Sequence, residues 1–214
     1  MGVLNGLLFA VAETLMDPTL VLVAFVTHLS GSALLLGLVV PLRDGSWFLP
    51  QLWVSSYLQS WPRKLKLYRY MAALRFAVWS GLVLAVFFVK DPRWLLLMFF
   101  VFFGVGAVAS GVSGLPFLEV VGKTIPPKKL GLFFAWRQAL GGLAGIVGSL
   151  VVGWMLAAGS PLAFPYNYGV LLGLGVILVA GGLAAFGNVA EPEDTDTRPA
   201  TSVLSQIRRG AQAF

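Results

Sequence analysis

The chain has 214 residues, of which 58% are hydrophobic and only 11% are charged. A soluble domain usually has about a quarter of its residues charged, so this composition indicates a membrane protein. Because cysteine is absent, disulfides, thiol catalysis and thiolate metal sites are excluded. The single histidine, His28, cannot build a histidine metal cluster, and we expect neither a metal nor a cofactor.

Six segments are apolar and long enough to cross a bilayer, which takes about 20 residues in a helix. They are residues 4–29, 33–58, 67–89, 93–121, 130–158 and 166–186. The breaks between them contain Gly, Pro, Ser or charged residues, which are turn signals. No Lys or Arg precedes the first segment, so we expect a permanent membrane helix and not a cleaved signal peptide. The predicted fold is an all-α bundle of six transmembrane helices over residues 1–187.

The distribution of cations predicts the topology. Lys and Arg gather in the second and fourth breaks and in the C-terminal tail, whereas the third break has only Lys90 and Arg93. The positive-inside rule then predicts that both termini lie in the cytoplasm, and an even number of spans is consistent with this. We expect the protein to lie in the cell (inner) membrane. The net charge of +6 is thereby explained by topology, and we expect no nucleic-acid partner.

The composition changes after the sixth segment. Residues 188–200 are polar and acidic, which predicts a cytoplasmic linker without packed structure. In residues 201–214 the apolar side chains fall on one helical stripe, which predicts an amphipathic helix on the cytoplasmic membrane surface. A frayed tail is the alternative interpretation.

Four charged residues lie at a similar depth in the first two predicted helices. Glu13 and Asp17 are four residues apart and share one helix face, with Asp17 about 20 Å into its segment. Arg43 and Asp44 lie about 15–17 Å into the second, antiparallel segment. An unpaired charge in hydrocarbon costs roughly 2.5–3.5 kcal/mol. We therefore expect Arg43 to contact Asp17 or Glu13, directly or through one water.

These four residues are the candidate site for solute binding and proton coupling. Two carboxylates on one face compete to stay ionised, so one of them is expected to hold a proton near neutral pH. Trp47 and Gln51, one and two turns beyond Arg43 and Asp44, are candidate solute contacts. A packing role is the alternative for Trp47. Acidic and basic groups at one depth suit cations, anions or zwitterions, and buried charges alternatively serve only to fix helix register.

A second set of charges lies closer to the cytoplasmic side. Glu119 and Arg137 are expected to form a structural ion pair between the fourth and fifth helices. Arg75 lies near the cytoplasmic end of the third helix, where a long side chain can extend to the membrane surface. We therefore expect polar groups inside the bundle from helices one, two, four and five, with helices three and six facing lipid.

Two further patterns concern packing and symmetry. Gly141, Gly145 and Gly148 fall on one side of the fifth helix and predict a close-packed face. Pro18 and Pro116 are expected to interrupt the first and fourth helices at comparable depth, which favours an internal repeat of three plus three helices.

The string GVSG at residues 111–114 resembles the serine motif of rhomboid intramembrane proteases. Such an enzyme needs a histidine base on a later helix, and the only histidine, His28, lies on the first. We therefore expect that the chain is not an enzyme.

Six helices, cytoplasmic ends, basic second and fourth breaks and an amphipathic tail together resemble the N-terminal half of a major facilitator superfamily transporter. The signature of that family between helices two and three is G-x-L-A-D-R-x-G-R-R, and the matching stretch here is SSYLQSWPRK. Arg63 and Lys64 stand at its basic pair, and Gln59 stands at its aspartate, without the carboxylate that forms a gating salt bridge in the family. The stretch KTIPPKKLGLFFAWRQALGG is similar to the loop and fifth helix of the family.

The resemblance implies a secondary active transporter of a small solute that works by alternating access, with proton coupling as one option. It implies that helices one and four line a central cavity, that two and five meet the other half, and that three and six lie outside. The family has twelve helices, so we expect a fragment, a split gene product or a self-associating half, completed by a second six-helix half. The alternative function is a non-transporting membrane scaffold or accessory subunit. Membrane lipids and a small-molecule substrate are the other expected partners.

Overall fold

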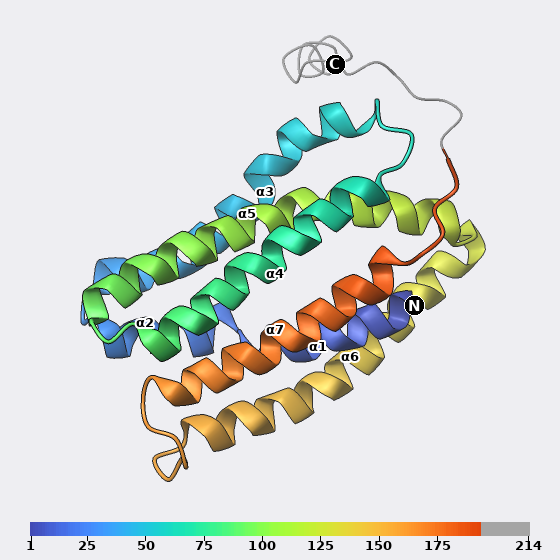
Figure 1. Cartoon of the computed structure of the whole chain (residues 1–214). Helices are drawn as coiled ribbons and strands as arrows, with labels where there is room; N and C mark the ends of the chain where they lie inside the picture. Colours follow the sequence, from blue (N-terminus) through green and yellow to red (C-terminus); the bar gives the residue numbers. More distant parts are fainter. Residues whose placement is uncertain (194–214) are drawn as a thin grey trace, which may run out of the picture.

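A computed structural model of the chain describes residues 1–193 (Figure 1). Most of the expected linker at 188–200, and the whole of the expected amphipathic helix at 201–214, lie outside the described residues. Within residues 1–193 every regular element is helical.

Six helical spans are long and apolar enough to cross a membrane. The first consists of three consecutive segments, which are α1 (Gly2–Leu15), η1 (Pro18–Leu22) and α2 (Val23–Leu29). The other five are single helices, which are α3 (Ala33–Leu58), α4 (Leu65–Phe88), α5 (Pro92–Thr124), α6 (Pro127–Leu156) and α7 (Tyr166–Gly187). The six predicted spans are confirmed, and their ends shift by less than one helical turn.

The first span is broken at Pro18, because proline lacks the backbone N–H that a continuous α-helix needs. Asp17 caps the new start, since its Oδ1 accepts hydrogen bonds from the backbone N–H groups of Thr19 (2.9 Å) and Leu20 (2.8 Å). The turn that follows, η1, is a π-helix. The matching interruption expected at Pro116 is wrong, because Pro116 lies buried inside an unbroken α5. Prolines inside a span are tolerated where neighbouring helices pack around them.

The contacts between spans give the lateral order α6, α1, α7, α4, α5, α3 (Figure 1). The second half of the first span, η1 and α2, crosses over to contact α3 and α5. Helices α3 and α6 are therefore the two edges of the bundle. Only 6% of the most apolar stretch of α3 and 17% of that of α6 is buried, against 50% for α7.

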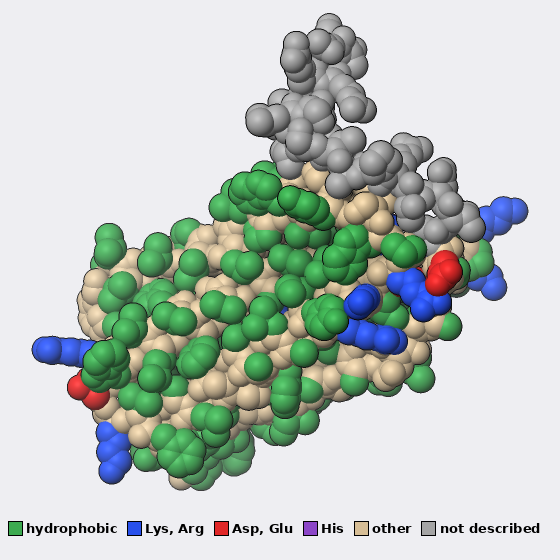
Figure 2. All heavy atoms as spheres, turned by 45° about the horizontal axis from the view of Figure 1, so that its top comes forward, with side chains coloured by type: hydrophobic (Ala, Val, Ile, Leu, Met, Phe, Trp, Pro, Cys, Tyr) green, Lys and Arg blue, Asp and Glu red, His purple; other side chains and the backbone are tan. Residues whose placement is uncertain are grey.

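Both the start of α1 and the end of α7 lie at the same end of the bundle (Figure 1). We call this end the basic end, because the 59–64 and 125–126 turns and the adjoining helix ends bring most of the cations there. These cations are Arg63, Lys64, Lys66, Arg69, Lys123, Lys128 and Lys129. The opposite end carries Lys90 and Arg93, and Figure 2 shows charged side chains at both ends of an otherwise apolar surface.

The close-packed glycine face predicted on α6 is confirmed, and its neighbour is α1. A Cβ added at Gly141 would lie 3.0 Å from the Cβ of Ala10, and one added at Gly148 would lie 3.2 Å from the Cβ of Thr14. The glycines therefore bring the two helix backbones close together, which is how helices pack in lipid without a large hydrophobic driving force.

Candidate functional site

A group of polar side chains meets inside the bundle near its basic end, and Asn5 on α1 lies at its centre. Asn5 is only 1% exposed. Its Nδ2 donates to the carbonyl of Gly182 on α7 (2.7 Å), and its Oδ1 accepts from Nη1 of Arg137 on α6 (2.7 Å). The same Nη1 donates to the carbonyl of Gly2 (3.1 Å). One amide and one guanidinium thus connect three helices.

Arg137 fits there because its neighbours are small or aromatic. Gly6 on α1 leaves room for the arginine stem, since a Cβ added at Gly6 would collide with it. The guanidinium carbon lies 4.9 Å from the ring centre of Phe117 on α5, a cation–π contact. The side chain therefore satisfies its charge inside protein and not in lipid.

Arg75 on α4 is a second interior arginine. Its guanidinium carbon lies 5.0 Å from the ring centre of Phe9 on α1, and its Nε is buried without a hydrogen-bond partner. The expectation that Arg75 extends to the membrane surface is therefore wrong, and so is the expectation that the third helix has no polar group inside the bundle. Tyr68, one turn into α4 and 3% exposed, also points inward and lies against Asn5.

Glu13 on α1 completes the interior polar cluster, which we define as Asn5, Glu13, Tyr68, Arg75 and Arg137. Its carboxylate is exposed, and it interacts electrostatically with both arginines without forming an ion pair among the described residues. Two arginines and one glutamate give the cluster a formal charge of +1.

Arg43 and Asp44 lie elsewhere, on the edge helix α3. Both side chains are exposed. Across residues 1–193, Arg43 forms no ion pair with Asp17 or Glu13, so the predicted cross-helix pair is not formed. The Asp17 carboxylate instead accepts three local hydrogen bonds at Oδ1, two from the start of η1 and one from the hydroxyl of Thr19 (2.6 Å).

The Glu119–Arg137 ion pair expected from the sequence is likewise not formed in the part of the chain that the structure describes. Glu119 is exposed on α5, while Arg137 turns toward α1 and bonds Asn5 and Gly2. Glu119 and Arg137 both lie close in sequence to the turn between α5 and α6. This similar distance gives their depth in the bundle, but it does not give the face of the helix on which each side chain lies.

Trp47 and Gln51 lie where α3 crosses α5. The backbone carbonyls of Ser46 and Trp47 approach Gly111 so closely that they would collide with a Cβ there. The Trp47 ring and the Gln51 amide lie beside Gly114. The glycines of the GVSG string therefore allow this close crossing. Its serine, Ser113, is 3% exposed and donates a hydrogen bond to the Ser110 carbonyl within α5 (2.9 Å). Trp47 is 39% exposed, so part of its ring remains available on the α3 face.

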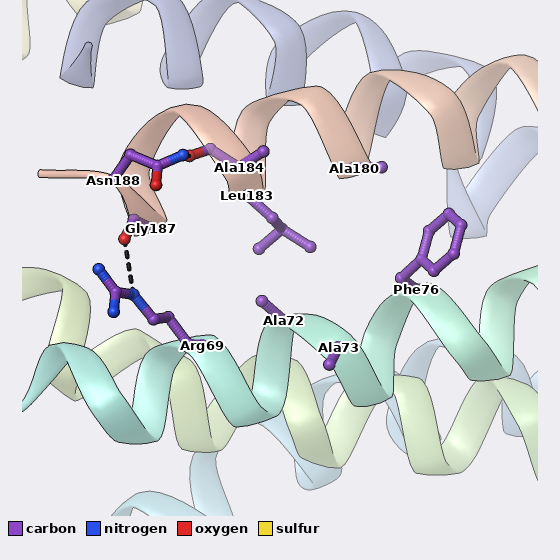
Figure 3. Close-up of a pocket in the computed structure, with 9 residues that line it drawn as sticks. All are labelled: Arg69, Ala72, Ala73, Phe76, Ala180, Leu183, Ala184, Gly187 and Asn188. Atoms are coloured by element: carbon purple, nitrogen blue, oxygen red, sulfur yellow. Dashed lines mark hydrogen bonds between the residues drawn. The ribbon is translucent and has the colours of Figure 1, made fainter.

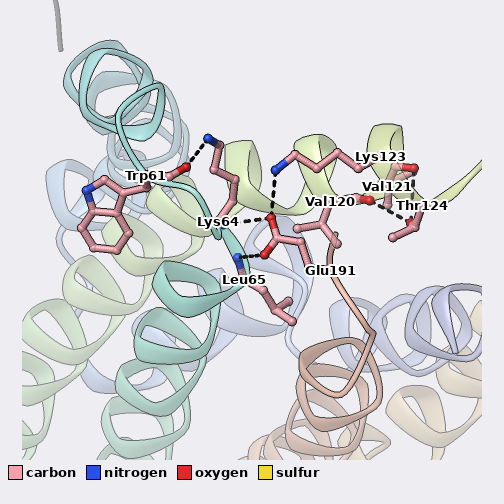
Figure 4. Close-up of polar contacts among 8 residues, drawn as sticks. All are labelled: Trp61, Lys64, Leu65, Val120, Val121, Lys123, Thr124 and Glu191. Carbon is pink, nitrogen blue, oxygen red and sulfur yellow. Dashed lines mark hydrogen bonds and ion pairs between the residues drawn. The ribbon is translucent and has the colours of Figure 1, made fainter. Parts of the chain in front are cut away.

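The three signature residues lie at the basic end, where Glu191 is the central acidic group (Figure 4). The Glu191 carboxylate is 2% exposed and lies beyond the end of α7. It accepts from the backbone N–H groups of Lys64 (2.9 Å) and Leu65 (2.7 Å) at the start of α4, and from Nζ of Lys123 at the end of α5 (3.0 Å). A helix N-terminus favours an anion, so one carboxylate connects the ends of three spans.

The other signature residues are less buried. Gln59 is the exposed C-cap of α3, and Arg63 pairs with Glu193 (2.6 Å), both side chains being more than 60% exposed. Lys64 is 2% exposed and its Nζ donates to the Trp61 carbonyl. The basic residues of the signature thus hold the turn between α3 and α4 against the segment that follows α7.

Sequence reasoning did not single out Asn5, Glu191 or the inward direction of Arg75. A signal existed for the first two. Asn5 is an amide in the apolar stretch that precedes Glu13, and Glu191 lies shortly after the last span, on the same side as the basic breaks. A polar residue within a membrane span indicates a partner inside the bundle.

Comparison with known proteins finds no family model that matches the chain, and no curated protein and no solved structure that is significantly similar to it.

Proposed function

We propose that this chain is a six-helix half of a secondary active transporter, similar to the N-terminal half of a major facilitator superfamily carrier, and that it moves a small solute by alternating access with a second bundle. The observation that carries the proposal is the exposure of Arg43 and Asp44 near the middle of α3, the least buried span. Charges at that depth are stable against water or protein and costly against lipid. An aqueous path or a second bundle on the α3 face supplies that environment.

The contacts between spans support a repeat of three plus three. Exchanging the first three spans with the last three converts the α1–α6 contact into the α5–α3 contact, and the α1–α7 contact into the α5–α4 contact. The α4–α7 contact is converted into itself. Inverted or parallel repeats of this kind are common in secondary transporters. In this arrangement, the two edge helices α3 and α6 are equivalent and meet the second bundle.

The cation distribution supports a cytoplasmic basic end. Seven Lys and Arg residues cluster there, against two at the opposite end. By the positive-inside rule, the protein then lies in a cell inner membrane with both termini in the cytoplasm. Under this topology the interior polar cluster lies in the cytoplasmic half of the bundle and Arg43 lies near the midplane.

The solute and coupling residues that we propose lie on two helices, α3 and α1. Arg43, Asp44 and Trp47, which are exposed on α3, and the half-buried Gln51 offer the contacts for a polar solute, and Glu13 on α1 is the candidate proton-coupling residue. A non-transporting scaffold is the second candidate, and the hydrogen bonds by which Asn5 and Arg137 connect three helices favour it.

Single-cysteine labelling tests the proposal, since the chain has no cysteine of its own. A membrane-impermeant maleimide should label Asp44→Cys in native membranes, because a thiol reacts as thiolate in water and not in lipid. Ile177→Cys on α7 is the control, since Ile177 is 68% exposed on a helix without charges and should remain unlabelled. Equal protection of both thiols would exclude an aqueous path along α3.

A second measurement separates transporter from scaffold. The purified protein is first screened for stabilisation against unfolding by small anions, cations, sugars and zwitterions, which identifies the solute. Uptake of that solute into proteoliposomes is then measured. Glu13→Gln should abolish the pH dependence of uptake and preserve solute-dependent stabilisation. If the maleimide labels Asp44→Cys but no class of solute stabilises the protein, the scaffold function is supported.

A further inference from the structure

A groove of about 380 Å³ lies between α4 and α7, close to the basic end (Figure 3). Each helix contributes two small side chains to it, and these are Ala72, Ala73, Ala180 and Ala184. Phe76 and Leu183 add to its apolar wall. Ala73 and Ala184 are exposed, so the groove opens onto the outer surface of the bundle. Its size and lining suit a hydrocarbon chain.

A second cavity of about 430 Å³ continues the groove toward the basic end, because Arg69 lines both. Arg69 Nε donates to the carbonyl of Gly187 at the end of α7 (2.7 Å), as Figure 3 shows. This bond fixes the side chain that the two cavities share. The cations that line the second cavity are Arg63, Lys66 and Arg69. The apolar groove therefore ends in a basic mouth.

The mouth has a formal charge of +2. Its three cations are offset by one exposed carboxylate, Glu193, which pairs with Arg63. Glu191 also lines the second cavity, but Lys123 balances its charge and two backbone N–H groups occupy its oxygens. The surplus of positive charge is complementary to one phosphodiester.

The depth of the two cavities matches the two parts of a phospholipid. Arg69 is four residues into α4, which places it about 6 Å from the helix end, at the level of lipid headgroups. Ala72 and Ala73 lie one turn deeper, at the level of acyl chains. We infer that the α4–α7 groove binds an anionic phospholipid, with the phosphate at Arg63, Lys66 and Arg69 and an acyl chain along the alanines. Basic pockets between spans on the cytoplasmic side recognise anionic headgroups in this way.

Binding of lipid is measured on the purified full-length protein in a neutral detergent, by native mass spectrometry with dioleoyl phosphatidylglycerol and dioleoyl phosphatidylcholine. The anionic lipid should bind about tenfold more tightly than the zwitterionic one, because each cation near the headgroup adds to its affinity. Equal affinity for the two lipids overturns the proposal. Glycerol phosphate, which has the phosphate without acyl chains, should not compete, and full competition would assign the mouth to a free phosphate compound.

The headgroup contacts are tested with Arg63→Gln combined with Lys66→Gln, which leaves the structural bond of Arg69 intact. Affinity for the anionic lipid should fall about tenfold. The matched control is Lys128→Gln combined with Lys129→Gln, which removes two exposed cations from the same end outside the groove and should change affinity by less than about twofold. An equal loss in both variants would mean general attraction to the basic end and would overturn a defined site.

The acyl-chain contact is tested with Ala184→Leu, which fills the groove, against Ala77→Leu, which adds the same side chain at an exposed position of α4 outside it. Only the first should weaken binding, by about fivefold, since it displaces buried hydrocarbon. The alternative to a lipid is tested through the two acidic residues that follow Glu193 in the sequence, Asp194 and Asp196. If Asp194→Asn with Asp196→Asn raises lipid affinity while the groove variants leave it unchanged, the tail and not a lipid occupies the mouth, and the proposal fails.

Discussion

The interior polar cluster and the exposed face of α3 both contain charged residues within membrane spans, but the surroundings of these charges differ. In the interior polar cluster, Arg137 bonds Asn5 and Gly2, so its charge is satisfied within the six helices. On α3, Arg43 and Asp44 are exposed and form no ion pair with any residue that the structure describes. The difference teaches that the cluster connects helices within the bundle, whereas the charges of the α3 face have no ion-pair partner among the described residues.

The comparison extends to the helices themselves. Half of the most apolar stretch of α7 is buried, and α7 carries no charge. Only 6% of that of α3 is buried, and α3 carries two charges near its middle. The bundle is thus built around an uncharged helix and presents charged residues at its edge, which is the arrangement that the proposed function requires.

The largest effect is expected at Glu191. Glu191→Ala removes a buried carboxylate that connects α4, α5 and the end of α7, and leaves the Lys123 ammonium without this partner. We expect a loss of about 3–5 kcal/mol in the free energy of unfolding, measured by chemical unfolding in micelles. Glu193→Ala, which breaks an exposed pair with Arg63, should cost less than about 1 kcal/mol. Similar losses in the two variants would show that the buried carboxylate of Glu191 stabilises the basic end no more than the exposed carboxylate of Glu193 does.

Arg137 and Arg43 test the comparison directly. Arg137→Met leaves the buried Asn5 Oδ1 without its donor, so we expect a loss of about 2–3 kcal/mol in unfolding free energy. Arg43→Met should change it by less than about 0.5 kcal/mol, because its side chain is exposed. A large loss from Arg43→Met would mean that α3 contributes its charge to the isolated bundle after all.

The attachment of α3 to α5 provides the third prediction. A Cβ at Gly111 would lie 2.8 Å from the Ser46 carbonyl and closer still to that of Trp47, and backbone atoms cannot turn aside as a side chain can. Gly111→Ala should therefore cost about 1–3 kcal/mol despite the better helix propensity of alanine. Gly122→Ala on the same helix has nothing within 4 Å and should stabilise by up to about 1 kcal/mol. If both variants are stabilising, the α3–α5 crossing is looser than described.

The smallest effect concerns Asp17, a charged residue whose partners lie within its own turn. Asp17→Ala removes the cap of η1 and should cost about 1 kcal/mol. Asp17→Asn keeps an oxygen acceptor and should preserve most of that stability. If the two substitutions cost the same, the charge of Asp17 matters more than its hydrogen bonds, and a double-mutant cycle with Arg43 would then show coupling in place of the additivity that we expect.

The cluster and the edge differ in how far the sequence could predict them. Gly141, Gly145 and Gly148 were assigned correctly to a packing face, because three small residues spaced by one turn have one physical use in lipid. Arg43, Glu119 and Arg137 were assigned wrong partners. Depth follows from counting residues, but the direction of a side chain around its helix depends on the neighbour that the helix packs against.

The sequence by itself determined the six spans, their ends and the gathering of cations at one end, because hydrocarbon thickness acts on each segment separately. It did not determine which proline breaks its span, since Pro18 begins η1 whereas Pro116 lies inside α5. Only the tertiary structure decided that Arg75 turns inward, that Asn5 joins three helices and that Glu191 connects the ends of α4, α5 and α7. These contacts join residues far apart in the chain, and their geometry is fixed by the lateral order of the spans, which local propensity does not specify.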